Sequence, residues 1–316
     1  MTGPVVALCG GVGAARLLRG LIQVVDPAEL IAVANVGDDC DLHGLAVSPD
    51  LDTITYTVGG QVNPATGWGL QGETWAAMGA MARFAVVRPA GSSAGATWFG
   101  LGDRDLATHL YRTGRRQEGA VLSTITAEVA AAFGLALRLV PVTDDRLRTV
   151  LTVDGADLDF QAWFVGRRHQ GTVTAIRFDG AATARPAPGV LAALAAARRI
   201  VVCPSNPLVS IAPLLAVPGV REALVRRRDD VVAVSPIIAG AAIKGPAATL
   251  LADLGHDVSA VGVAHLWAPV AGRLVIDRAD AALAPAVEAA GMACTMAPTL
   301  MADDATARAL AAVVTA

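Results

Sequence analysis

The first 35 residues carry the feature that most constrains the fold. An apolar run at residues 5–8 is followed by the glycine turn Gly10-Gly11-Val12-Gly13. Apolar residues then recur at helical spacing over residues 14–25, and residues 30–35 form a second apolar run. A strand, a glycine turn, a helix and another strand make a βαβ unit, whose strands run parallel. The sequence therefore predicts an α/β fold built on a parallel sheet.

The same alternation returns in the last third of the chain. The pattern there predicts strands at 200–203, 231–235 and 274–276, and helices at 190–197, 246–254, 281–290 and 305–314. No internal repeat or linker interrupts it. We expect one α/β domain over residues 1–316, a Rossmann-like three-layer fold with a mostly parallel sheet. Its ligands should bind at the carboxyl ends of the strands.

The middle of the chain is less regular. Strands are predicted at 137–142 and 172–178, with a hairpin of 150–153 and 158–165 turning at Asp154-Gly155. We interpret residues 137–180 as a strand-rich insert within the domain.

Three helices are predicted outside that insert. One starts at Pro49 and runs to residue 58, one spans 103–112 with Asp103 as its cap, and one runs from a Thr126 cap to residue 133.

Composition excludes several classes of protein. Hydrophobic residues make up 54% of the chain and charged residues 17%, which excludes intrinsic disorder. The charge-free stretch 200–220 contains four prolines, which a membrane-spanning helix would not tolerate. No signal peptide is recognised and no two of the four cysteines form a CxxC pair, so we expect a cytoplasmic protein with free thiols. The net charge of -3 argues against nucleic-acid binding.

Two segments have the chemistry of phosphate binding. A glycine turn before a helix places backbone N–H groups and the helix dipole at one point, so Gly10, Gly11 and Gly13 could hold a phosphate. The turn lacks the third glycine of the dinucleotide fingerprint and the lysine of a P-loop. Ser205 and Asn206, between two prolines after a buried strand, form a polar hook suited to hydrogen bonding a phosphate or a base.

A cluster of carboxylates follows the second strand. Asp38, Asp39, Asp50 and Asp52 are hard oxygen ligands, which favour Mg²⁺. Asp39 and Asp50 could instead be a turn residue and a helix cap. No nucleophilic triad or HExxH motif is present. These residues fit magnesium-assisted chemistry on a phosphate ester.

Two further segments could surround a flat organic substrate. Trp68, between Gly67 and Gly69, could stack on a ring. Trp75 is expected to be a core residue. The segment from Gly100 through Asp103 to His109 brings backbone close to a ligand, and its helix start puts three side chains about one turn apart. These three are Arg104, Thr108 and His109.

Taken in order, these segments resemble the 2-phospho-L-lactate transferase family, which includes the actinobacterial phosphoenolpyruvate transferases of coenzyme F-420 biosynthesis. The resemblance covers nearly the whole chain. It rests on Gly10–Ala14, Asn35–Asp39, Ser48–Thr53, Gly67–Gly69, Glu73–Trp75, Leu101–His109, Phe160-Gln161 near Trp163, Pro204–Pro207, Ser235–Ile238 and Thr299–Met301.

The resemblance implies a magnesium-dependent enzyme, commonly a homodimer. It would transfer a phospho-three-carbon acid from a guanylyl-activated donor to the deazaflavin alcohol Fo and release GMP. It implies Asp38 and Asp52 at the metal, Asp50 beside them, and Asp50 and Asp52 as catalytic residues.

The same resemblance assigns the substrate contacts. The glycine turn with Ser205 and Asn206 would bind the guanylyl phosphates. The residues implied around Fo are Asp52, Trp68, Gly100, Asp103, Arg104, Thr108 and His109.

Cys40 and Gly100 depart from the residues common in other members. Phospholactate, phosphoenolpyruvate and phosphoglycerate donors therefore stay open, and residues 98–103 favour phosphoenolpyruvate.

Two other functions stay open. One is a non-catalytic regulator that binds a nucleotide sugar, like the gluconeogenesis-factor relatives with a similar glycine turn. The other is an NAD-dependent oxidoreductase, disfavoured by the incomplete dinucleotide fingerprint.

Overall fold

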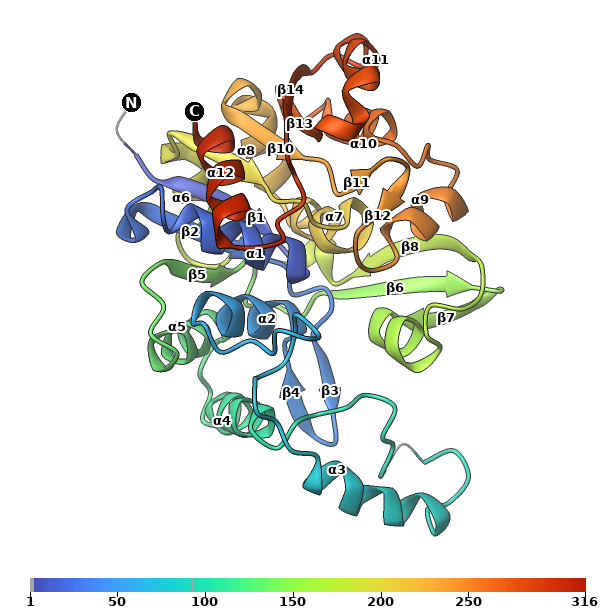
Figure 1. Cartoon of the computed structure of the whole chain (residues 1–316). Helices are drawn as coiled ribbons and strands as arrows, with labels where there is room; N and C mark the ends of the chain where they lie inside the picture. Colours follow the sequence, from blue (N-terminus) through green and yellow to red (C-terminus); the bar gives the residue numbers. More distant parts are fainter. Residues whose placement is uncertain (1–2, 93) are drawn as a thin grey trace.

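A seven-stranded parallel sheet forms the centre of the molecule (Figure 1). The computed structural model describes residues 3–92 and 94–316. The strand order is β14-β13-β10-β9-β1-β2-β5, and every neighbouring pair is parallel. The strands are β1 (Val5–Cys9), β2 (Leu30–Ala34), β5 (Arg138–Pro141), β9 (Arg199–Val202), β10 (Val231–Val234), β13 (Arg273–Asp277) and β14 (Ala293–Ala297). The predicted α/β fold is confirmed.

Helices cover the sheet because its strands are apolar on both faces. Every residue of β1 and β10 is buried, so neither face can be left to water. The helices are α1 (Gly11–Leu21), α2 (Pro49–Val58), α3 (Ala76–Met81), α4 (Asp105–Gln117), α5 (Leu122–Ala132), α6 (Val190–Ala196), α7 (Ala212–Ala216), α8 (Val220–Arg226), α9 (Ala247–Asp253), α10 (Ala260–Trp267), α11 (Ala284–Ala289) and α12 (Asp304–Thr315). Helix α1 packs between α12 and α2.

A separate antiparallel sheet, β7-β6-β8, extends from the main sheet (Figure 1). Its strands are β6 (Arg148–Val153), β7 (Ala156–Asp159) and β8 (Val173–Asp179). It begins at Arg148 rather than at residue 137, because β5 pairs with β2 in the main sheet. The predicted strand at 158–165 is wrong beyond Asp159. There the chain turns into a π-helical segment, Ala162–Gly166, which buries Trp163 completely.

Two predicted helix caps are wrong. The Asp103 carboxylate accepts hydrogen bonds from the N–H groups of Ala76 and Ala77, so it caps α3 rather than α4. The start of α4 is capped by Glu73, whose carboxylate accepts from the N–H groups of Arg104 and Asp105. Each of the two helices is therefore capped by a residue that lies next to the other helix in the sequence.

Helix α5 begins at Leu122, four residues before its predicted Thr126 cap. The backbone N–H and the hydroxyl of Ser123 both donate to the Asp144 carboxylate, which supplies the cap.

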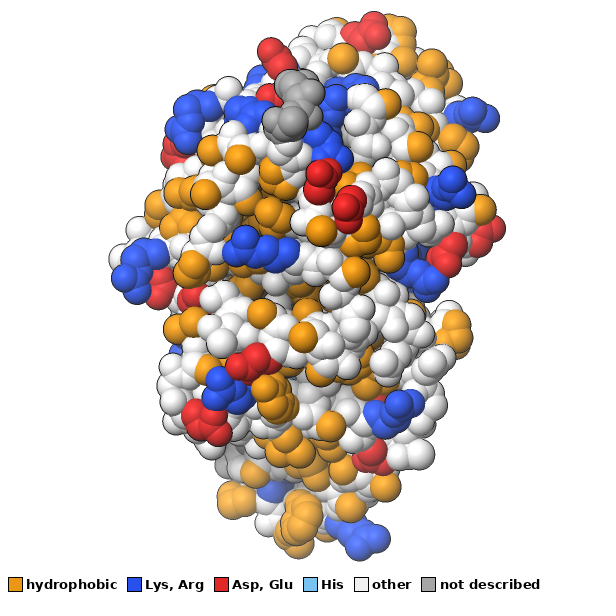
Figure 2. All heavy atoms as spheres, turned by 90° about the vertical axis from the view of Figure 1, so that its left-hand side faces the viewer, with side chains coloured by type: hydrophobic (Ala, Val, Ile, Leu, Met, Phe, Trp, Pro, Cys, Tyr) orange, Lys and Arg blue, Asp and Glu red, His pale blue; other side chains and the backbone are white. Residues whose placement is uncertain are grey.

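Two segments on either side of α2 in the chain project below the sheet (Figure 1). The hairpin of β3 (Cys40–Leu42) and β4 (Leu45–Val47) precedes α2, and helix α3 with the 3-10 turn Ala82–Val86 follows it. Phe84, Val86 and Val87 are exposed there, and Figure 2 shows hydrophobic side chains gathered at the lower end of the molecule. A short hairpin follows β10 in the chain. Its two strands, β11 (Ile237–Ile238) and β12 (Ala241–Ala242), are each two residues long.

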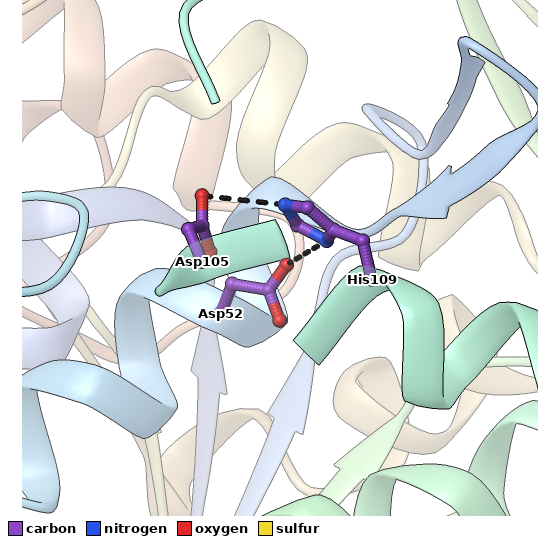
Figure 3. A group of neighbouring side chains, drawn as sticks. All are labelled: Asp52, Asp105 and His109. Atoms are coloured by element: carbon purple, nitrogen blue, oxygen red, sulfur yellow. Dashed lines mark ion pairs between the residues drawn. The ribbon is translucent and has the colours of Figure 1, made fainter. Parts of the chain in front are cut away.

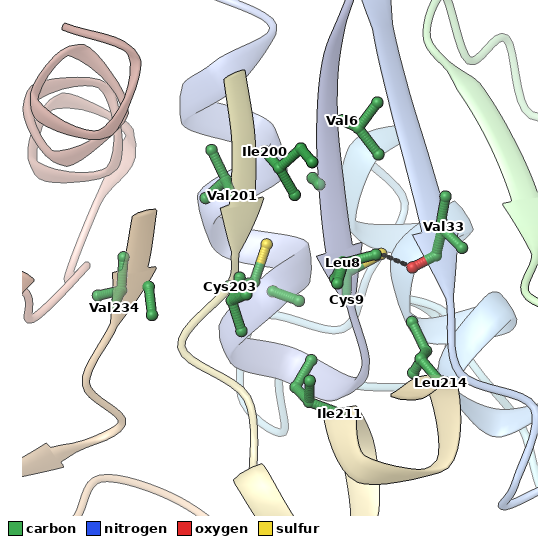
Figure 4. Packing of buried hydrophobic residues seen from close by; sticks show 14 of the residues in the cluster. Val6, Leu8, Cys9, Val33, Ile200, Val201, Cys203, Ile211, Leu214 and Val234 are labelled. Atoms are coloured by element: carbon green, nitrogen blue, oxygen red, sulfur yellow. Dashed lines mark hydrogen bonds between the residues drawn. The ribbon is translucent and has the colours of Figure 1, made fainter. Parts of the chain in front are cut away.

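The core packs around the central strands (Figure 4). Cys9 and Cys203 are buried there as free thiols, and Cys9 Sγ donates to the Val33 carbonyl at 3.3 Å. Burial raises the pKa of the Cys9 thiol, so it behaves as an apolar residue.

Within the described residues, no single helix has the length and apolar character needed to cross a membrane. The segments Pro207–Ala216 and Val220–Arg226 together are long and apolar enough, but the chain bends by 95° between them.

Helix α1 can approach α12 only because residue 20 is glycine. A Cβ at Gly20 would lie 2.2 Å from the Ala307 carbonyl oxygen, whereas a Cβ at Gly114 in α4 would meet nothing within 4 Å. We expect Gly20→Ala to lower the free energy of unfolding by about 1–3 kcal/mol. Gly114→Ala should raise it by roughly 0.5–1 kcal/mol because alanine favours the helix. Urea denaturation checks both, and a neutral Gly20→Ala would contradict the close helix contact.

Candidate functional site

A cavity of about 810 Å³ opens at the carboxyl edge of the parallel sheet. Its floor comes from the residues that follow four strands, namely Gly10 after β1, Asp38 after β2, Ser205 after β9 and Ser235 after β10. This is where ligands were expected. Helices α2 and α4 supply one wall and the segment after β7 supplies another.

The glycine turn places the N-terminus of α1 against this cavity. Helix α1 begins at Gly11, three residues earlier than predicted. A Cβ at Gly10 would lie 2.6 Å from Asp50 Oδ2, and one at Gly13 would lie 2.3 Å from the Pro204 carbonyl oxygen. Glycine is therefore required for the helix to start this close to its neighbours. All three glycines line the cavity.

The two polar residues after β9 do different things. The Ser205 hydroxyl donates to the Gly10 carbonyl at 2.8 Å and accepts from the Gly10 N–H at 3.3 Å, so it braces the glycine turn. Asn206 Oδ1 accepts from the N–H groups of Leu208 and Val209 and caps the turn Pro207–Ile211. Its amide nitrogen is buried without a partner among the described residues. That nitrogen is available to a ligand, since Asn206 lines the cavity.

Asp38 and Asp50 form a buried pair. The Asn35 amide nitrogen donates to Asp38 Oδ1 at 3.2 Å and to Asp50 Oδ2 at 2.9 Å. Burial, and then repulsion from Asp50, raise the pKa of Asp38 well above its usual range. Burial raises the pKa of Asp50 to about 6, against hydrogen bonds from Asn35 and the Gly11 N–H. Two crowded carboxylates that share one donor are an oxygen site that suits a divalent cation.

Asp39 lies beside this pair but does not line the cavity. Its Oδ2 accepts a hydrogen bond from the Ser48 hydroxyl at 2.7 Å. Burial raises the pKa of Asp39 to about 8.

Asp52 has a different environment, because Arg112 binds both of its carboxylate oxygens. The Arg112 Nη1 also lies 3.2 Å from His109 Nδ1, and His109 Nε2 lies 3.2 Å from Asp105 Oδ2 (Figure 3). Asp52 Oδ2 is 3.7 Å from His109 Nδ1. The predicted metal pair Asp38 and Asp52 is thus divided between two groups, Asp38 with Asp50 and Asp52 with Arg112.

Asp52, Asp105 and His109 could by themselves hold a metal ion. The Arg112 guanidinium already occupies the two Asp52 oxygens, which makes this group a poor cation site. Tyr56 closes it by donating to Asp105 Oδ1 at 2.5 Å.

The residues predicted around Fo fall into two sets. Asp52, Trp68, Gly100 and His109 line the cavity, and Asp103, Arg104 and Thr108 do not. Asp103 serves as the α3 cap described above. The Arg104 guanidinium donates to the Gln71 carbonyl at 2.6 Å, and Thr108 is buried. Trp75, expected in the core, is 49% exposed and packs against Gly100.

Sequence reasoning missed several residues of the cavity wall. These are Arg16, Tyr56, Asp105, Arg168, His169 and Lys244, all of which line the cavity. The spacing of Asp105, His109 and Arg112 at four and three residues gave a signal for one helix face. The positions of Arg168 and Lys244 follow from tertiary packing and left no local signal.

Comparisons with known proteins identify the family of this chain. The model of the family 2-phospho-L-lactate transferase CofD matches residues 5–293. A phosphoenolpyruvate transferase of Kitasatospora aureofaciens is 44% identical over 95% of this chain and 92% of its own. The phosphoenolpyruvate transferase of Streptomyces griseus is 43% identical over 96% of this chain and 95% of its own. That of Mycobacterium tuberculosis is 43% identical over 82% of each chain.

Solved structures support the fold alone. A Bacillus halodurans protein of the UPF0052 family has a TM-score of 0.62 at 13% identity, covering 99% of both chains. A second crystal structure of the same Bacillus halodurans protein gives a TM-score of 0.60 at 15% identity, covering 94% of this chain and 93% of its own. From the family match and the full-length relatives together, the chain belongs to the 2-phospho-L-lactate transferase family, the transferases of coenzyme F-420 biosynthesis.

Proposed function

We propose that this protein transfers a phospho-three-carbon acid from a guanylyl-activated diphosphate donor to the ribityl hydroxyl of Fo and releases GMP. One observation carries the proposal. A single cavity brings together a buried carboxylate pair, a helix N-terminus and aromatic side chains, including Trp68 and Phe99. These are the groups needed for a cation, a phosphate and a flat ring system.

The reaction forms one P–O bond and breaks another. The Fo hydroxyl oxygen bonds to the phosphorus that bears the three-carbon acid, and that phosphorus loses the bridging oxygen of the diphosphate. GMP departs with the bridging oxygen, and the hydroxyl proton passes to a base. Asp52 is suited to orient the hydroxyl, because Arg112 holds both of its oxygens. Asp50 lines the same cavity, but as a proposed Mg²⁺ ligand it would be a weak base, so the proton passes to solvent water.

We propose that Asp38 and Asp50 hold Mg²⁺. When bound, the cation supplies charge neutralisation at the phosphates. The residues fit it, since both carboxylates are buried, line the cavity and share a single hydrogen-bond donor. This revises the predicted ligand set, with Asp50 in place of Asp52. Asn35 sets the spacing of the pair, and the glycine turn with Asn206 faces the donor phosphates.

Phosphoenolpyruvate is the proposed source of the three-carbon acid. The support is the naming of the full-length relatives at 43–44% identity as phosphoenolpyruvate transferases. A homodimer in the cytoplasm is proposed as the working form, and the exposed Phe84, Val86 and Val87 offer apolar surface for an interface.

Fluorescence titration with Fo, with and without Mg²⁺, tests the proposal. Saturable binding followed by turnover with the guanylyl-activated phosphoenolpyruvate donor supports it. The matching phospholactate and phosphoglycerate donors then rank the acids. Failure to bind Fo under any condition would overturn the transferase assignment for this chain and favour a nucleotide-sugar-binding regulator.

The role of Asp52 can be tested through Arg112. Arg112→Lys keeps the positive charge but loses the two-pronged contact, so Asp52 is no longer fixed in orientation. We expect kcat to fall by about tenfold or more while KM for the donor changes little. Arg116→Lys is the control, because Arg116 pairs with the exposed Asp41. An unchanged kcat in folded Arg112→Lys would show that Asp52 does not need this partner.

The proposed metal pair predicts that one substitution, Asp38→Asn, changes Tm differently without and with Mg²⁺. Without Mg²⁺, Asp38→Asn should raise Tm, because it removes the cost of burying the Asp38 carboxyl group and its repulsion from Asp50. With Mg²⁺, the wild type should gain on the order of 2–4 °C per kcal/mol of binding free energy, and Asp38→Asn should gain nothing. Thermal shift assays measure both, with Asp41→Asn as the control. A full Mg²⁺ response in Asp38→Asn would exclude Asp38 as a ligand.

A further inference from the structure

We propose that Arg16 and Lys244, with the Gly67 turn between them, form the site that binds the diphosphate of the donor. The inference rests on the proposed function, since the donor is proposed there. It adds two cationic residues that neither the sequence patterns nor the comparisons assign to any ligand.

The two cations converge on one turn of the chain. Arg16 Nη1 donates to the Met301 carbonyl at 3.1 Å, and Lys244 Nζ donates to the Thr66 carbonyl at 2.8 Å. A Cβ placed on Gly67 would lie 3.0 Å from Lys244 Nζ and 3.9 Å from Arg16 Nη2. Both positive groups therefore flank the same turn, although their residues are far apart in sequence.

Neither cation has an acidic partner within residues 3–92 and 94–316. Arg19, one turn further along α1, pairs with Asp304 instead. Like charges held side by side repel one another, and backbone carbonyls compensate them only in part. An anion between them would remove the repulsion.

The surroundings favour an anion with several charges. Arg16 and Lys244 line the cavity together with Gly11 and Gly13, at the N-terminus of the 11-residue helix α1. The dipole of that helix adds positive potential at the same place. The carboxylates of Asp38 and Asp50 line the same cavity and repel an anion unless a cation covers them. The diphosphate therefore fits between the two cations and the proposed Mg²⁺ site.

Residue 67 has to be glycine for this geometry. Its φ of +75° is in the left-handed region, and a side chain there would press on the Lys244 ammonium and on Val12. The next residue, Trp68, also lines the cavity. A ligand at the two cations would thus lie directly beside this turn.

Lys244 is the only lysine in the sequence, where every other basic side chain of the 25 lysines and arginines is arginine. Lysine presents a compact point charge on a flexible stem, which suits a phosphate that must be released after reaction. It also gives a specific probe. Reductive methylation with ¹³C-formaldehyde labels Lys244 and the α-amino group alone, so an NMR spectrum contains one lysine signal and an internal reference.

The first measurement is a titration of the labelled protein with GDP and, separately, with guanosine. We expect GDP to shift the Lys244 dimethylamine resonance and to leave the α-amino resonance unchanged. Guanosine, which has no phosphate, should shift neither. A Lys244 resonance that does not respond to saturating GDP would overturn the inference.

Variants supply the second measurement. Lys244→Gln and Arg16→Gln should each weaken GDP binding by about tenfold, as expected for loss of a charged hydrogen bond, and leave guanosine binding unchanged. Lys244→Arg should restore most of the affinity. Arg19→Gln is the matched control on the same helix, because Arg19 pairs with Asp304. Calorimetry gives each Kd.

The outcomes separate the two proposals. Equal GDP affinity in wild type and Lys244→Gln, with normal turnover in the wild type, refutes the cation site alone. Wild-type protein that binds neither GDP nor Fo refutes the proposed function itself.

Discussion

One buried guanidinium joins helix α4 to helix α2 and to the hairpin of β3 and β4. Arg112, on α4, binds both oxygens of Asp52 on α2 and donates to the Ala46 carbonyl on β4. It is 3% exposed, so its charge has to be met by partners inside the protein. The wall of the cavity between α2 and α4 therefore depends on this ion pair. His109 and Asp105 are held against the cavity by the same set of contacts.

The cavity separates its charges in a way that the amino-acid composition does not reveal. Carboxylates after β2 and on α2 lie at its floor, and the cations Arg16 and Lys244 flank the start of α1. A net charge of -3 describes neither region. A substrate with a diphosphate and a cation could meet both regions at once, which explains how one cavity holds opposite charges without pairing them.

Much of the fold could be predicted because local sequence specifies it. Strands β9, β10 and β13 and helix α2 lie where the apolar pattern placed them, whereas the edge strand β14 was not predicted. The caps of α3 and α4 could not be predicted from local sequence, because each cap comes from a distant part of the chain. Asp103, next to α4, caps α3, and Glu73, next to α3, caps α4. In the site, the glycines and Asp50 were recognisable from motifs. The partner of Asp52 was not, because the contact joins residues 60 positions apart.

The exchange of caps between α3 and α4 has a consequence for how this region opens. Glu73 stabilises the start of α4, and Asp103 stabilises the start of α3, so neither helix end is complete without the other segment. Residues 73–92 and 94–105 should then gain and lose protection from hydrogen exchange together, as one cooperative unit. Phe99 and Gly100 line the cavity within that unit. Access to this side of the cavity is thereby linked to local unfolding rather than to the movement of a single side chain.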